Sequence, residues 1–189
     1  MIIDSTFIII IGYAAMKSFY IFDIETIPDI ETIQTIFDIS ENNPLLVSQK
    51  ALRVLSDEAQ KEIVFFPPYL HKVVCYSASI VNQDGDIHFI AKTLSSEITE
   101  EQLIHHFWNS AQGNYLVSYN GASFDLPVLE LRALKYGLAL PFYYQGKSKF
   151  ENYRYKYGDL HTDLVDFLSN FGTTKKAKLD HIAGLVGLP

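Results

Sequence analysis

The chain has 189 residues, is 48% hydrophobic and 14% aromatic, and so excludes a disordered protein while allowing one domain with a substantial core. Its formal net charge of −7 argues against a module that grips nucleic acid by electrostatic attraction alone, because such modules are basic. It leaves open a site whose carboxylates bind metal ions. A single cysteine, Cys75, excludes disulfides within the chain, which fits a reducing compartment, and we expect a cytoplasmic protein.

The chain begins with an apolar segment from Phe7 to Met16. It is shorter than the ~20 residues that a membrane-spanning helix needs, and it lacks the positive start of a secretory signal. It is either an added edge strand or the product of a mis-assigned start, with the true start at Met16. We favour the second, and expect a non-native or disordered extension over residues 1–15, one domain over 16–189 and no membrane contact.

Hydrophobic patterning predicts the elements in chain order. A strand over 18–24 is followed by a mixed region with a helix near 48–61. Strands over 73–81 and 87–94 flank the turn at Asn82–Gly85, as in a β-hairpin. A helix over 99–110, a strand over 115–119, a helix over 124–135, a strand over 160–163, a helix ending at Leu168 and a helix over 179–186 complete the chain.

This order predicts an α/β fold in which an antiparallel hairpin lies beside parallel strands with helical crossovers. Functional sites in such sheets form at the carboxyl ends of the strands. The residues at those ends are therefore the first candidates for a functional site.

Two carboxylates, Asp23 and Glu25, follow the first predicted strand in Phe22-Asp-Ile-Glu-Thr26. Side chains two residues apart on a strand share a face, and two carboxylates on one face repel unless a cation lies between them. Oxygen ligands at close range suit Mg²⁺ or Mn²⁺. Taken alone, this pattern is equally typical of an acidic turn.

A third carboxylate, Asp125, lies at the start of a predicted helix directly after the strand over 115–119. A parallel crossover would bring Asp125 beside Asp23 and Glu25. Asp125 could instead simply stabilise the helix N-terminus. Three converging carboxylates are unfavourable without cations, so the set favours a metal site.

The stretch Asp-Ile-Glu-Thr at 23–26 resembles the first motif of the DEDD 3′→5′ exonucleases. Tyr-Asn-Gly-Ala-Ser-Phe-Asp-Leu-Pro-Val-Leu at 119–129 resembles the second motif, in the form seen in family B DNA polymerase proofreading domains. Residues 68–74, 160–166 and 179–185 resemble segments of stand-alone, predicted exonucleases related to those domains. The resemblance covers about residues 17–189, and the two motifs at this spacing make it specific.

The resemblance implies an RNase H-like fold, a mixed five-stranded sheet flanked by helices, with two Mg²⁺ or Mn²⁺ ions. Asp23 and Asp125 would be metal ligands, and Glu25 would hold the ion on the side of the nucleophile. The expected substrate-binding residues are Thr26, Asn120 and Phe124, although Asn120 is also a plain turn residue and Phe124 also a core residue. The implied activity is 3′→5′ hydrolysis of single-stranded nucleic acid, DNA rather than RNA, in repair or turnover.

The third motif of the family is a Tyr or His followed by the fourth Asp on a late helix. Two short stretches of this chain resemble it. They are Tyr155-Lys-Tyr-Gly-Asp159 and His161-Thr-Asp-Leu-Val-Asp166. Both come soon after Asp125 and before the last predicted helices, so we interpret neither of them as the true third motif. We therefore expect that the domain lacks its last helix and that its activity is uncertain.

Three other functions remain open. A non-catalytic domain of the same fold would bind single strands through basic and aromatic residues, namely Lys147, Lys149, Arg154, Lys156, Lys175, Lys176, Lys178, Tyr143, Tyr144, Tyr153 and Tyr155. Packing is the more common role for such tyrosines. The others are a structural domain with an incidental acidic cluster and a nuclease that acts on RNA.

Overall fold

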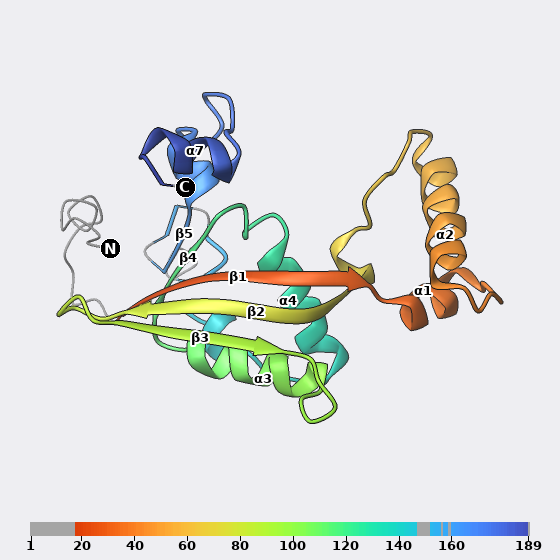
Figure 1. Ribbon diagram of the computed structural model, residues 1–189, viewed down its shortest axis with the longest axis horizontal. Coiled ribbons are helices and arrows are strands. Elements are labelled where there is room, and N and C mark those ends of the chain that lie inside the picture. Colours follow the sequence, from red (N-terminus) through yellow and green to blue (C-terminus); the bar gives the residue numbers. More distant parts are fainter. Residues whose placement is uncertain (1–17, 147–151, 156, 159, 189) are drawn as a thin grey trace.

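The computed structural model describes residues 18–146, 152–155, 157–158 and 160–188 (Figure 1). Five strands form one mixed sheet in the order β3-β2-β1-β4-β5. β2 pairs antiparallel with both β1 and β3, whereas β4 pairs parallel with both β1 and β5. The strands are β1 (Phe19–Pro28), β2 (His71–Val81), β3 (Ile87–Thr93), β4 (Tyr115–Ser118) and β5 (His161–Asp163). The predicted hairpin beside parallel strands is confirmed.

The helices connect these strands as crossovers and excursions. They are α1 (Ile30–Phe37), α2 (Pro44–Ala59), the 3₁₀ turn η2 (Pro68–Leu70), α3 (Glu100–Ala111), α4 (Asp125–Lys135), α5 (Pro141–Tyr144), α6 (Leu164–Leu168) and α7 (Leu179–Leu185). The predicted helices over 99–110, 124–135 and 179–186 match α3, α4 and α7 to within one residue at each end.

The main core lies between the sheet and helices α3 and α4, which pack against the same face of the sheet (Figure 1). Alternate residues of β1, Tyr20, Phe22 and Ile24, point into this core because successive strand residues face opposite sides. Phe107 of α3 packs edge-on against Tyr20 and Phe22. Leu129 of α4 is buried in the same cluster, so α4 is held firmly beside the central strand.

Helices α1 and α2 form an excursion beyond the end of β1, with a small core of their own (Figure 1). The sequence predicted one helix near 48–61, and α1 was missed. Asp29 caps α1 by accepting the N–H of Thr32, and Asn43 caps α2. The excursion core consists of Ile33, Val47, Ala51, Phe66 and Leu70.

Strand β1 is longer than predicted. It continues through Thr26 to Pro28 because it pairs with β2 along its whole length, from Phe19 opposite Val81 to Pro28 opposite His71. The register shifts between Glu25 and Thr26, as in a β-bulge. The prediction that this strand ends at residue 24 was therefore wrong.

The second face of β1 is exposed at Ile21, Asp23, Glu25 and Ile27. This face therefore presents both carboxylates of the first motif to solvent. Within the ranges given above, no helix has the length and apolar character needed to cross a membrane. The predicted extension over residues 1–15 lies outside the described part of the chain.

Candidate metal-binding and nucleotide-binding site

The three predicted carboxylates belong to two elements that approach each other where the parallel sheet ends. Pairing between β1 and β4 ends at Ile21 and Val117. Asp23 and Glu25 lie beyond that point, within β1 and on its exposed face. After β4 the chain turns back and begins α4 at Asp125. We expected Asp23 and Glu25 at the end of the first strand. They do lie just beyond the last residue of β1 that pairs with β4, but β1 itself continues past them to Pro28.

A tight turn between β4 and α4 positions Asp125. Asn120 adopts a left-handed conformation with φ of 67°, and its backbone N–H donates to Asp163 Oδ1 at 2.8 Å. The N–H of Ala122 donates to the other oxygen of Asp163 at 3.0 Å. A Cβ atom on Gly121 would lie 2.5 Å from Ser118 Oγ, so only glycine lets the turn approach the strand this closely.

Asp125 reaches from its helix to the central strand. Its Oδ1 accepts the backbone N–H of Ile24 at 3.2 Å, and the residue is 6% exposed. Burial and the negative charge of Asp23 raise the pKa of Asp125 to about 6, although the hydrogen bond from Ile24 opposes this. The ionised carboxylate is therefore unfavourable here, and a nearby cation would stabilise it.

The donor set fits a hard divalent cation, since Asp23, Glu25 and Asp125 offer carboxylate oxygens. Among the described residues, no lysine or arginine forms an ion pair with these three. In the described ranges, no three acidic, histidine or cysteine side chains lie close enough together to hold an ion, so the predicted convergence of all three carboxylates is not found in this structure. Asp23 and Asp125 interact, and the exposed Glu25 shares the face of Asp23.

Two of the expected substrate residues, Thr26 and Phe124, both contact His71. Thr26 Oγ1 is 2.9 Å from His71 Nδ1, and the ring of Phe124 packs edge-on against His71 with centroids 4.9 Å apart. Phe65 contacts both rings. Asn120 is an exposed turn residue bound to Asp163 through its backbone, which matches its plainer interpretation.

A buried ionic network holds α4 against the other end of β1. Arg132 of α4 pairs with Asp29 and with Glu100, and all three are almost fully buried. Burial alone would raise the pKa of Asp29, but hydrogen bonds from Lys135, Thr32 and Arg132 hold that pKa below its ordinary value. The network joins α4, the helix that begins with Asp125, to Asp29 directly after β1 and to Glu100 at the start of α3.

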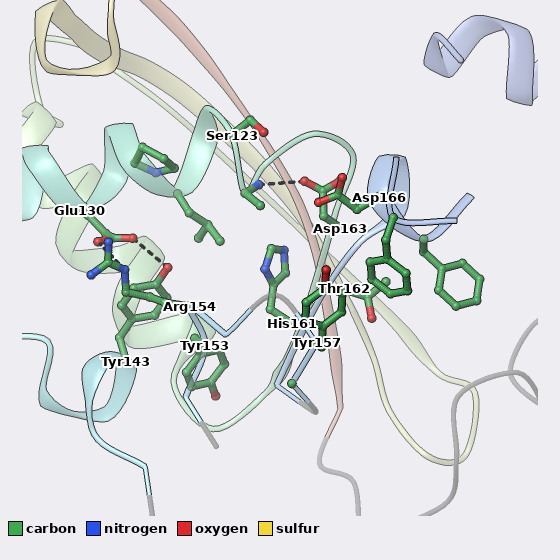
Figure 2. A pocket seen from close by; sticks show the side chains of 16 residues that line it. Ser123, Glu130, Tyr143, Tyr153, Arg154, Tyr157, His161, Thr162, Asp163 and Asp166 are labelled. Atoms are coloured by element: carbon green, nitrogen blue, oxygen red, sulfur yellow. Dashed lines mark hydrogen bonds and ion pairs between the residues drawn. The ribbon is translucent and has the colours of Figure 1, made fainter. Parts of the chain in front are cut away.

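A cavity of about 620 Å³ lies on the β5 side of α4 (Figure 2). Its lining includes Glu130, Arg154, His161 and Asp163 but none of the three predicted carboxylates. Two tyrosines of its lining, Tyr143 and Tyr153, are buried in the main core, which confirms packing for these two, whereas a third, Tyr157, is 60% exposed.

In the second stretch that resembles the third motif, both the histidine and the final aspartate contact other residues. His161 Nε2 lies 2.9 Å from Ser118 Oγ, and burial lowers the pKa of His161 to about 4. Asp166 pairs with Lys176. The first such stretch includes Lys156 and Asp159, which lie outside the described residues, as do Lys147 and Lys149.

Sequence reasoning missed His71, Arg132 and Asp163. Arg132 could have been suspected, because it occupies an inward position on the apolar face of α4, seven residues after Asp125. Asp163 directly precedes a helix, as N-cap residues do. No local signal points to His71, whose partner Thr26 is 45 residues away.

Two solved structures share the fold. The family B DNA polymerase from the hyperthermophilic archaeon Pyrobaculum calidifontis aligns with 93% of this chain at 19% identity and a TM-score of 0.52. E. coli exonuclease I in complex with a 5cy-dA13 oligonucleotide aligns with 92% of the chain at 11% identity and a TM-score of 0.51. The chain spans only 19% of the first protein and 37% of the second. No curated protein matches it.

The sheet order, the helices and these structural neighbours define an α/β domain with an RNase H-like fold. The model of one protein family, described as predicted 3′-5′ exonuclease related to the exonuclease domain of PolB, matches residues 63–189. The chain belongs to this family.

Proposed function

We propose that this protein is a metal-dependent 3′→5′ exonuclease that removes nucleotides from single-stranded nucleic acid, DNA rather than RNA, in the cytoplasm. One observation carries the proposal: Asp125, buried at the start of α4, accepts the backbone N–H of Ile24, the residue between Asp23 and Glu25 in β1. Membership of the exonuclease family supports it. The oligonucleotide bound to the structurally similar exonuclease I supports a single-stranded DNA substrate.

Asp23, Glu25 and Asp125 are the residues that would hold two Mg²⁺ or Mn²⁺ ions. Bound there, the ions would activate water and stabilise the charge that develops on the phosphodiester oxygens. Asp125 would bind in its ionised form, and the N–H of Ile24 would keep one of its oxygens oriented. The exposed face of β1 leaves Asp23 and Glu25 open to a substrate phosphate.

Thr26 follows Glu25 in the sequence, Phe124 precedes Asp125, and both side chains contact His71. A terminal nucleotide whose phosphate lies at the carboxylates would meet both side chains. Asn120 would act through the turn that positions Asp125, because its backbone is bound to Asp163.

The test is incubation of the full chain with 5′-labelled single-stranded DNA or RNA, with Mn²⁺ or with EDTA. We expect a ladder that shortens from the 3′ end only with Mn²⁺, and faster on DNA. Asp23→Asn should abolish it. Asp57→Asn, which changes an exposed aspartate of α2, is the matched control and should leave it unchanged. Strand binding without degradation would instead indicate a non-catalytic binding domain.

A further inference from the structure

Three aromatic rings form a cluster beside the carboxylates, here called the ring cluster: Phe65, His71 and Phe124. The centroids of Phe65 and His71 are 4.9 Å apart, those of Phe65 and Phe124 5.4 Å, and those of His71 and Phe124 4.9 Å. Phe65 comes from the loop between α2 and η2, His71 begins β2, and Phe124 precedes α4. Three separate segments thus bring one ring each to the same place.

Hydrogen bonds hold the central ring of this cluster. His71 Nε2 lies 3.0 Å from the carbonyl oxygen of Phe66, which can only accept, so Nε2 carries the hydrogen. Nδ1 then accepts from the hydroxyl of Thr26, 2.9 Å away. Burial lowers the pKa of His71, which keeps the ring neutral. The ring is therefore fixed in place and uncharged.

Phe65 is the most exposed ring of the ring cluster. It is 62% exposed, and the preceding Val64 is 76% exposed, so an aromatic face meets solvent next to the site. Exposed apolar surface is unfavourable in water, and nucleobases offer a flat apolar partner whatever their sequence. His71 and Phe124 both contact this ring, tilted at 34° and 57° to it, while most of its surface meets solvent.

The geometry points to Phe65 as a nucleobase-stacking residue, which takes the base of the 3′-terminal nucleotide against its exposed face. This inference rests on the proposed function, because it needs the terminal phosphate at Asp23 and Asp125. The ring cluster touches Thr26, next to Glu25, and contains Phe124, next to Asp125. A nucleotide with its phosphate at the carboxylates would therefore bring its base to Phe65.

The test measures the dissociation constant of fluorescently labelled single-stranded DNA with Mn²⁺ present and a non-hydrolysable linkage before the 3′-terminal nucleotide, which separates binding from hydrolysis. Phe65→Ala should weaken binding about tenfold, the effect of losing one base–aromatic stack. Phe65→Trp should restore it. Phe89→Ala removes an even more exposed phenylalanine, 81% exposed on the edge strand β3, and should change nothing.

A strand whose 3′-terminal residue lacks a base provides the second arm of the experiment. It should bind wild type about tenfold more weakly than the normal strand does, and Phe65→Ala should weaken it no further. Equal loss on both strands would overturn the stacking role, as would an unchanged affinity of Phe65→Ala for the normal strand. A wild type that binds strands in this manner without degrading them would overturn the proposed hydrolysis and leave the stacking contact, with its phosphate at Asp23 and Asp125, standing.

Discussion

The carboxylate of Asp125 accepts the backbone N–H of Ile24 at 3.2 Å, across 101 residues of sequence. This hydrogen bond brings the first residue of α4 to Ile24, the residue that lies between Asp23 and Glu25 in the sequence of β1. The same placement buries Asp125 near the charge of Asp23, which raises its pKa to about 6. The metal-free protein therefore carries a destabilising interaction at the site we propose for metal binding.

Removing that interaction should stabilise the metal-free protein. At pH 7.5 with EDTA, we expect Asp125→Asn to increase the free energy of unfolding by about 1–3 kcal/mol, since ionised Asp125 is disfavoured by roughly two pKa units. Asparagine can still accept the N–H of Ile24. Urea unfolding of both proteins measures the difference. A less stable variant would show that the carboxylate is compensated by partners in the folded protein.

Two groups should contribute with opposite sign to the pH dependence of the free energy of unfolding. The pKa of Asp125 is raised to about 6 from 3.8, so its contribution to stability is present below pH 3.8 and is lost as the pH rises through 6. The pKa of His161 is lowered to about 4 from 6.5, so its contribution is present above pH 6.5 and is lost as the pH falls through 4.

The two contributions should largely cancel between pH 4 and pH 6.5 in the wild type, and single variants should separate them. Relative to wild type, Asp125→Asn should gain stability as the pH rises across this range, whereas His161→Gln should lose it. Each change should approach about 3 kcal/mol. Urea unfolding at half-unit pH steps checks both, and parallel curves for all three proteins would contradict the assignment.

Removing Arg132 from the buried network should destabilise the protein far more than removing the exposed member, Lys135. Arg132→Met would leave Asp29 and Glu100 buried without their main partner, which should destabilise the protein by about 3–5 kcal/mol. Lys135→Met removes a partner of Asp29 that is 38% exposed and should lower stability by less than about 1 kcal/mol. Chemical unfolding of the two variants side by side tests this, and equal losses would argue against the network.

The turn before α4 should not tolerate a side chain at Gly121. Gly121→Ala would place Cβ 2.5 Å from Ser118 Oγ and 2.6 Å from Ser118 Cβ, so we expect a loss of about 1–3 kcal/mol from overpacking. Gly184→Ala, within α7 and with open space around it, should instead gain up to about 1 kcal/mol from helix propensity. Thermal unfolding should show shifts of opposite sign, and a neutral Gly121→Ala would contradict the tight turn.

The sequence predicted much of the fold because hydrophobic periodicity is local. The alternation in β1 and the apolar face of α4 both follow from residues a few positions apart. The end of β1 could not be predicted locally, because Thr26 to Pro28 are held in the strand by pairing with His71 to Val73 of β2. Helix α1 was missed because it is short and depends on the cap at Asp29 and on a small separate core.

Part of the candidate site could likewise be predicted from local sequence, and part depends on contacts between distant segments. Asp23, Glu25 and Asp125 could be named from motifs, and the structure brings Asp125 to Ile24 and within reach of the charge of Asp23. The ring cluster could not be predicted, because His71 is joined to Thr26 and Phe124 only by the folded arrangement of three segments. Contacts across such separations leave no periodic pattern in the sequence.

The central claim is that Asp23, Glu25 and Asp125 together bind divalent cations, and calorimetric titration with Mn²⁺ at pH 7.5 tests it most directly. We expect saturable binding to the wild type, a loss of at least tenfold in affinity in Asp125→Asn, and unchanged binding in Asp57→Asn. Binding that is equal in wild type and Asp125→Asn, or no binding to wild type at all, would contradict the account.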